Sequence, residues 1–560
     1  MTSQGATSLS RLWLGVAVVV LAVLVLVEGV PESPQGGFGR RNLEVPILLA
    51  LGGVVVLAAV AAWWVPRVAA AVAAPAGFLL GGLAGVEHAP LTGVVVAAVV
   101  VAAAAATWWA ARPGPVWRGA GVLVGLALVA VTLPGTRTTH RYLGPTQPES
   151  DTVLAPVDLV RWAWAGGTTA DGVTVTAEVA GDGDAVLVVD DDDGVDDAVR
   201  SAPQPARAGE VVRLRVEGLV PDTAYTYAVE VGGRLDRGRP GRFRTFPDGP
   251  ASFAVAVGAC AWTGSNGRVF DTIREREPLL FLHTGDLHYE DITVDDPERF
   301  HEAYDDVLTS PSQSSLYRST SVAYVWDDHD FGGNDADGRV PSRRAAHAAY
   351  REVVPHYPLP GGDEGTIHQA FTIGRVRVVV LDTRSGREPG GRDGGGTMLG
   401  AEQLAWLRSE LEAASGRFPL VLLVNPDPWI APAEPGRDDW GGYAEERAEV
   451  AEAIAAADTQ VVMLSGDAHM VALDDGTNSN YSRVSGQGFP VLHAAALDRR
   501  GTRKGGPYSD GTHPGGGRFG WVEVHDDGGD ELRVALTGLT WRGEQLVHHE
   551  LTVPVPAGAS

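Results

Sequence analysis

The chain has 560 residues, of which 45% are hydrophobic and 20% are charged, and its formal net charge at pH 7 is -26. This length exceeds what one domain needs, and the hydrophobic residues are concentrated in the first 135, which excludes a soluble domain alone. The negative charge argues against a nucleic-acid-binding surface, which would need a basic stripe. A single cysteine, Cys260, precludes an internal disulfide.

Residues 1–135 are predicted to form a transmembrane helical domain. Five apolar stretches approach the roughly 20 residues that span about 30 Å of hydrocarbon. The last two lack any polar face, which argues against buried helices of a soluble protein. A cleavable signal peptide behind Arg11 is an alternative for the first stretch, and the third is the weakest because it contains Pro75. The stretches are residues 12–27, 45–65, 68–86, 91–111 and 119–133.

The placement of arginines predicts the orientation in the cell membrane. If Arg11, Arg67, Arg112 and Arg118 lie inside, five spans place the C-terminal part outside the cytoplasm. Four spans, with residues 68–86 not crossing, would leave it inside. We therefore expect a multi-pass protein that contacts the lipid bilayer and carries an extracytoplasmic C-terminal region.

Residues 136–156 are predicted to be a polar linker, and residues 157–247 a small antiparallel β domain. Four segments alternate or run apolar between Gly, Pro and Asp turns. Residues 218–233 and 242–247 resemble the strand pair and last strand of fibronectin type III-like sandwiches. No cluster of His, Cys or carboxylates falls at its strand ends, so we interpret it as a spacer or packing module. The four segments are residues 173–179, 185–189, 211–216 and 225–231.

Residues 251–550 are predicted to form a layered α/β domain, because strands and helices alternate there. The tail, residues 519–550, returns to β structure. The predicted strands cover residues 253–257, 279–282, 322–325, 376–381, 420–424 and 461–464, and the predicted helices cover residues 269–276, 343–353, 401–414 and 444–457.

Three clusters of acidic residues and histidine each follow one of these strands. They are GDLHYED (residues 285–291), WDDHDFGGND (residues 326–335) and SGDAH (residues 465–469). Because a parallel sheet gathers the carboxyl ends of its strands on one edge, we expect the clusters to converge. Three carboxylates within residues 326–330 would repel one another unless a cation compensates. The pattern therefore predicts a metal site.

The residue types in these clusters predict two different cations. Asp286 has two oxygens able to bridge two metals, and Tyr289 could supply a phenolate. Phenolate, thiolate and imidazole favour a transition metal, whereas Asp and Asn oxygens favour Ca²⁺, Mg²⁺ or Mn²⁺. Two cations about 3.5–4 Å apart clamp the attacking and leaving oxygens of a phosphoryl transfer. The residue types therefore predict a centre that holds two different metals.

Four motifs, in order, resemble those of the alkaline phosphatase D family of metallophosphoesterases, over roughly residues 250–525. They are GAC (residues 258–260), Gly-Asp with Tyr289, WDDHD (residues 326–330) and SGDAH (residues 465–469). The resemblance implies an α/β/β/α metallophosphoesterase domain that hydrolyses phosphomonoesters or phosphodiesters by metal-hydroxide attack. Members of the family are usually secreted, so the multi-span start is a departure.

The resemblance also implies roles for individual residues. His329 would protonate the leaving oxygen, with Asp286 bridging the metals. Asn425 occupies the mid-chain ligand position, although Asp427 is equally near, and Asp327 is a further candidate ligand. An iron-like metal would be held by Cys260, Asp286, Tyr289 and His469, and calcium or another divalent cation by Asp286, Asp328, Asn334 and Asp467.

Two basic features lie outside these motifs. Arg384 is a candidate for binding the substrate phosphate, with a solvated loop arginine as the alternative. Residues 489–511 contain Arg499, Arg500, Arg503 and Lys504, the only lysine of the chain. We interpret this segment either as a basic lip that attracts anionic phosphate or as a solvated loop.

The sequence thus predicts a membrane-anchored, metal-dependent phosphatase acting on a phosphate ester. One alternative is a phospholipase-like phosphodiesterase acting on lipid headgroups, which membrane anchoring would favour. Another is a non-catalytic, metal-stabilised surface-binding protein. The intact set of Asp286, Asp328, His329, Asp467 and His469 argues against that alternative.

Overall fold

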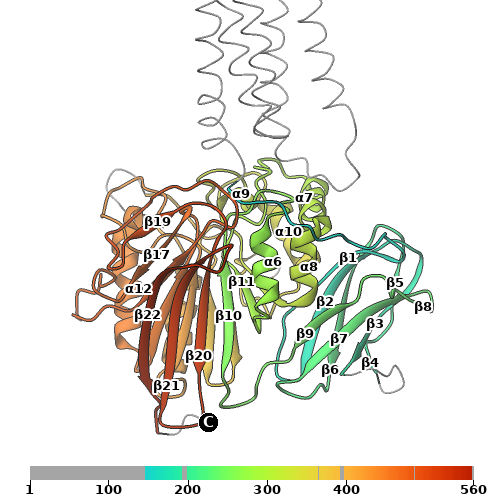
Figure 1. Ribbon diagram of the computed structural model, residues 1–560. Helices are drawn as coiled ribbons and strands as arrows, with labels where there is room; N and C mark the ends of the chain where they lie inside the picture. The colour runs from blue at the N-terminus through green and yellow to red at the C-terminus, as the bar shows by residue number, and fades with distance from the viewer. Residues whose placement is uncertain (1–145, 192–197, 363–364, 391–395, 485, 558–560) are drawn as a thin grey trace, which may run out of the picture. The chain divides into compact units, whose positions relative to one another are not determined.

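The computed structural model describes residues 146–191, 198–362, 365–390, 396–484 and 486–557 (Figure 1). The five predicted membrane stretches, residues 136–145 of the predicted linker and part of the acidic run near residue 192 lie outside these ranges. Among the helices within the ranges, none combines the length and the apolar character required to cross a bilayer.

Two mixed sheets form the centre of the C-terminal region, and each contains four neighbouring parallel strands. The first sheet contains, in order, β22 (Gln545–Pro554), β21 (Glu531–Thr540), β20 (Arg518–His525), β10 (Phe253–Gly258), β11 (Leu280–His283) and β12 (Ser321–Tyr324), and continues beyond β12. The second contains, in order, β13 (Gln369–Ile373), β14 (Val376–Val380), β15 (Leu420–Asn425), β16 (Gln460–Ser465), β18 (Val491–Ala494), β17 (Met470–Asp474) and β19 (Thr512–Pro514).

Helices cover the outer faces of the two sheets, giving four layers. Side chains alternate along the strands of the second sheet, as the period of two requires. Val378 and Leu422 join the core shared with the first sheet, whereas Val379 and Leu423 pack with the helices on the other side. Those helices are α11 (Ala401–Ala414) and α12 (Ala444–Ala456); the first sheet is covered by α6 (Arg268–Glu275), α7 (Pro297–Thr309), α8 (Pro311–Ser319) and α10 (Arg343–Val353).

The β-sandwich is not separated from this architecture, because the first sheet runs into it. Strand β1 pairs in parallel with β12 at Gly166 and Val322. A Cβ at Gly166 would lie 2.4 Å from the Val322 carbonyl oxygen, so only glycine allows this approach. Beyond β12 the sheet continues with β1 (Val160–Gly166), β2 (Gly172–Val179) and β6 (Val211–Glu217).

A second, smaller sheet completes the sandwich around its own buried core. The indole of Trp164 on β1 donates a 3.0 Å hydrogen bond to the Val353 carbonyl at the end of α10. The sandwich therefore packs directly on the α/β domain. The smaller sheet comprises β3 (Gly183–Asp190), β4 (Val199–Arg200), β5 (Gln204–Ala206), β7 (Ala224–Val231), β8 (Arg234–Leu235) and β9 (Gly241–Arg244).

Candidate metal centre

The motif clusters lie just beyond the carboxyl ends of parallel strands. Cys260 follows β10, Asp286 follows β11, the 326–330 motif follows β12 and Asp467 follows β16. Strands β10, β11 and β12 are consecutive neighbours in the first sheet, and β16 belongs to the sheet that packs on it. The expected convergence of distant clusters is therefore present.

The backbone is bent at these positions. Cys260, Asp286, Asp467 and Asp335 have φ angles of 62°, 55°, 67° and 58°. Non-glycine residues rarely adopt this left-handed region, and such strain clusters at functional sites. At Cys260, Asp286 and Asp467 the backbone therefore leaves the extended conformation just beyond the end of a strand.

Glycines let the strand ends come together. A Cβ at Gly285 would lie 2.4 Å from the Cβ of Asp327. A Cβ at Gly466 would lie 2.7 Å from the Thr284 hydroxyl. The glycine of each Gly-Asp pair is therefore required by close packing, independently of the aspartate that follows it.

The first group of potential ligands contains a thiol, a carboxylate and an imidazole. One donor atom from each of Cys260, Asp286 and His469 lies within 4.8 Å of the others. The Tyr289 hydroxyl donates to Asp286 Oδ2 at 2.5 Å and lies 3.2 Å from His469 Nε2. The structure thus brings together all four residues predicted for the iron-like site.

The orientation of His469 is fixed by the backbone. Its Nδ1 lies 2.7 Å from the Arg500 carbonyl oxygen, which can only accept a hydrogen bond. Nδ1 therefore carries the proton, which leaves the Nε2 lone pair directed at the group. Burial, followed by Arg499, lowers the pKa of His469 to about 3, so the ring is neutral near pH 7.

Oxygen atoms dominate the adjoining groups. Asp286, Asp328 and His329 form a second set of donors within 4.8 Å, and Asp328, Asp335 and Asp438 form a third. The predicted ligand Asn334 is exposed, and it immediately precedes Asp335, whose backbone N–H donates to Asp328 Oδ2 at 2.7 Å. The oxygen-rich region therefore includes carboxylates that were not predicted as ligands.

The imidazole of His329 is held by Asp291. His329 Nδ1 lies 2.6 Å from Asp291 Oδ1. Burial disfavours the imidazolium, but Asp286 and then Asp291 outweigh it and raise the pKa of His329 to about 9. The two carboxylates thus favour the imidazolium, the form that a general acid must have before it acts.

Negative charge at the site lacks full compensation from the protein alone. Burial, and then Asp328, raise the pKa of Asp286 to about 8. Burial, and then Asp286, raise the pKa of Cys260 and of Tyr289 well above their ordinary values. Bound cations would favour the ionised forms of all three groups, so the electrostatics fit a metal centre.

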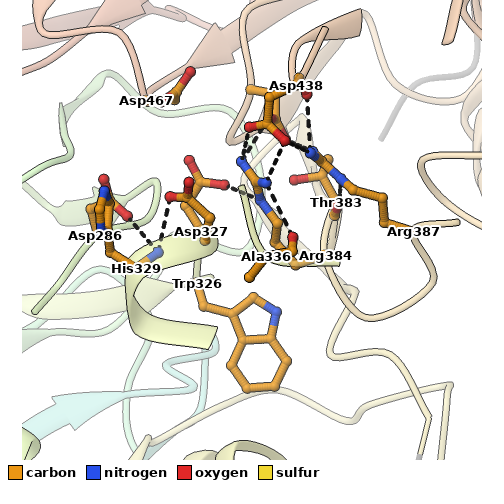
Figure 2. A network of polar contacts seen from close by, with 12 residues as sticks. Asp286, Trp326, Asp327, His329, Ala336, Thr383, Arg384, Arg387, Asp438 and Asp467 are labelled. Atoms are coloured by element: carbon orange, nitrogen blue, oxygen red, sulfur yellow. Dashed lines mark hydrogen bonds and ion pairs between the residues drawn. The ribbon is translucent and has the colours of Figure 1, made fainter. Parts of the chain in front are cut away.

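Arg384 is placed differently from either sequence interpretation. It is fully buried, and its guanidinium donates to Asp327 at 2.5 Å and to Asp438 at 2.9 Å (Figure 2). It also donates to Asp427 at 2.9 Å. Arg387 contacts the same Asp427 and Asp438. The predictions of a phosphate-binding or solvated Arg384 are therefore corrected, because three carboxylates occupy its donors.

The mid-chain candidates are engaged within the protein. Asn425, at the end of β15, accepts from the Trp440 indole at 2.8 Å and donates to the Asp427 carbonyl at 2.6 Å. The two oxygens of Asp427 accept from Arg384 and Arg387. Asp327 uses one oxygen for Arg384. Asn425 and Asp427 are thus engaged within the protein, whereas Asp327 Oδ2 is buried without a hydrogen-bond partner.

The basic segment reaches the site at two points. Arg499 lies over the rings of Trp262 and Tyr289, at 3.7 and 3.9 Å from their centroids. Lys504 Nζ lies 2.6 and 2.9 Å from the two oxygens of Asp467. The interpretation of this segment as a plain solvated loop is therefore wrong for these two residues.

Comparison with known proteins agrees with this geometry. Residues 253–503 match the family model described as PhoD-like phosphatase. A solved structure of PhoD aligns with a TM-score of 0.57 and 18% identity, covering 71% of this chain and 93% of that one. Purple acid phosphatase PPD1 from yellow lupin (Lupinus luteus) seeds aligns with a TM-score of 0.50 and 14% identity, covering 71% and 75%. The curated proteins contain no match.

The comparisons identify the kind of domain that carries the site. The two structural likenesses show that the α/β region has the phosphatase fold of those structures. The family match adds that the region is a PhoD-like phosphatase domain. The chain is accordingly a phosphoric ester hydrolase.

Sequence reasoning missed several residues of the site. Asp291 and Asp335 are the last residues of two predicted clusters, so proximity to the motifs could have found them. Asp438 lies in a loop far from any predicted strand end, and Arg387 follows Arg384 by three positions. Neither carries a sequence signal, because their roles depend on a buried ion-pair network.

Replacing Arg384 should test that network. Arg384→Met leaves buried carboxylates without their partner, which should lower the free energy of unfolding by about 3–5 kcal/mol. Although burial opposes it, Arg384 with Arg387 holds the pKa of Asp438 below its ordinary value of 3.8. This part of the stability is present above that pH and is lost as the pH falls further. Urea unfolding followed by tryptophan fluorescence measures the change.

Arg408→Met is the matched control. Arg408 pairs with Glu449, and both side chains are largely exposed. A surface pair of this kind contributes about 0–1 kcal/mol. Equal losses in the two variants would show that the buried network does not have the stabilising role described above.

Proposed function

We propose that the chain is a membrane-anchored, metal-dependent phosphatase that hydrolyses phosphomonoesters or phosphodiesters. Its centre would hold an iron-type cation together with calcium or another divalent cation. The observation that supports this most directly is the convergence of Cys260, Asp286, Tyr289 and His469 beside an oxygen-rich group.

The donor chemistry separates two cation sites that share one residue. Sulfur, phenol oxygen and imidazole nitrogen are donors suited to a transition metal. Asp328 and Asp335 offer carboxylate oxygens, which suit calcium or another hard cation. Asp438 lies beside them, with both its oxygens accepting from Arg384. Asp286 belongs to both the thiol-containing group and the group with Asp328. It is therefore the residue able to bridge the two sites.

When bound, the cations would supply positive charge for the phosphoryl transition state and make water nucleophilic near neutral pH. His329 would release its Nε2 proton to the leaving oxygen, while Asp291 holds Nδ1. Arg384 would act only through the carboxylates that it holds.

Asp286→Asn tests the central assignment. The amide carries no charge and cannot bridge two cations, so kcat should fall by at least about 10³. Turnover of p-nitrophenyl phosphate and metal content should be measured on the same full-length preparation. Asp295→Asn, at an exposed ion pair with Arg344, should retain wild-type kcat. Normal turnover of the Asp286 variant with full metal content would refute the assignment.

Asp291→Asn tests the proton donor. Loss of the carboxylate that positions His329 should lower kcat for alkyl phosphates by about 10- to 100-fold, since their leaving oxygens need a proton. Turnover of p-nitrophenyl phosphate, which has a good leaving group, should change much less. Asp291→Glu should restore part of the lost rate. A uniform loss on both substrates would argue for a structural role instead.

Tyr289→Phe and Cys260→Ser test the iron-type assignment. A phenolate or thiolate bound to ferric iron transfers charge into the metal, so the wild-type chain should absorb visible light. Each variant removes one such donor and should remove or shift the band. A colourless wild type that contains only zinc or calcium, and that tolerates both changes, would overturn the assignment.

Membrane anchoring rests on the hydropathy of residues 1–135. With five spans, residues 151–560 would lie outside the cytoplasm. A reporter that is active only in the cytoplasm, fused after Ser560, should therefore be silent. Reporter activity would instead indicate four spans, with residues 68–86 not crossing, and a cytoplasmic phosphatase domain.

A further inference from the structure

The single lysine of the chain lies at the metal centre. The chain has 44 lysine and arginine residues, and only Lys504 is a lysine. Its Nζ lies 2.6 Å from Asp467 Oδ1 and 2.9 Å from Asp467 Oδ2. Both oxygens of a carboxylate that the SGDAH motif marks as a metal ligand therefore contact an ammonium group.

The surroundings of Lys504 are those of a cation site. Although burial opposes them, Asp467 and then Asp328 and Asp438 raise the pKa of Lys504 above its ordinary value. The charge of Lys504 in turn acts to lower the pKa of Asp335. The ammonium thus contacts Asp467 directly and is attracted by the carboxylates of the oxygen-rich group. A lysine ammonium is a compact point charge, whereas an arginine guanidinium is a planar fork. The position accordingly holds the basic side chain whose charge most resembles a small cation.

The segment that carries Lys504 is attached to the SGDAH motif. The His469 N–H donates to the Thr502 hydroxyl at 3.0 Å, and the Thr502 N–H donates to the His469 carbonyl at 3.1 Å. On the other side of Lys504, the Gly506 N–H donates to the Ile430 carbonyl at 2.6 Å. The backbone on both sides of Lys504 is therefore held in place beside the site.

We propose that the Lys504 ammonium serves as an internal cation in place of a divalent metal ion beside Asp467. Asp467 is then bound by the chain itself, and the divalent cations use Asp286, Asp328 and Asp335. The inference rests on the proposed function, because it concerns the same metal centre. It goes further by assigning one ligand of the motif to a lysine rather than to a metal.

Calcium binding to the purified full-length chain tests the proposal. Equilibrium dialysis against Ca²⁺, after removal of divalent ions with EDTA, gives the number of ions bound and their affinity. Lys504→Met removes the charge and keeps much of the side-chain length, so this variant should bind an additional calcium ion per chain. Lys504→Arg keeps the charge and should bind the wild-type number. An unchanged number in Lys504→Met, or a gain in Lys504→Arg, would overturn the proposal.

Asp467→Asn provides an independent test of the proposal. If Lys504 holds Asp467, this variant should bind as much Ca²⁺ as the wild type, and it should abolish the gain when combined with Lys504→Met. Loss of a calcium ion from Asp467→Asn alone would show that the metal displaces the lysine, which contradicts the proposal. Binding is measured without turnover, so absence of phosphatase activity in the wild type would count against the proposed function and not against this result.

Discussion

Repulsion among buried carboxylates governs how this site is built. The 326–330 motif alone brings three aspartates to one strand end, and Asp286 and Asp467 approach it from other strands. Several kinds of positively charged side chain compensate this repulsion. Arg384 and Arg387 form ion pairs with buried aspartates, and His329 and Lys504 each contact one carboxylate. The negative charge that these groups do not compensate lies on the donors proposed to bind metal. Each compensating group thereby limits which oxygens stay available for a cation.

The same constraint accounts for the local backbone. A carboxylate at the end of a straight strand would continue the alternation of the sheet instead of facing its counterparts. Left-handed φ angles at Cys260, Asp286 and Asp467 redirect these side chains, and Gly285 and Gly466 remove the Cβ atoms that would hold the strand ends apart. Strain is thus confined to the few positions where the chemistry requires it, on a framework of buried aliphatic strands.

The sequence predicted the helices and strands well, but only some of the contacts between residues that are distant in sequence. Helices α10 and α11 begin and end at the predicted residues, because apolar periodicity and helix formers agree there. The convergence of Cys260, Asp286, Tyr289 and His469 followed from strand ends and motifs. The pairing of β1 with β12, the hydrogen bonds of Asn425 and the burial of Arg384 did not. Each of these depends on a partner distant in sequence, and neither an arginine after a strand nor an alternating segment reveals which partner it meets.

Continuity of the first sheet changes what counts as the smallest intact unit. If the chain were cut before residue 251, β12 would keep β11 but lose β1, which pairs with it at Gly166 and Val322. It would then form an open edge of the sheet, which favours aggregation. The preceding segment is also tied in, since Gln147 hydrogen-bonds the Leu497 carbonyl and the Val269 N–H. Autonomous folding, domain transfer between proteins and tolerance to insertion should therefore follow a boundary near residue 146, ahead of the sandwich. The sandwich thus covers the edge of the phosphatase sheet that β12 would otherwise expose.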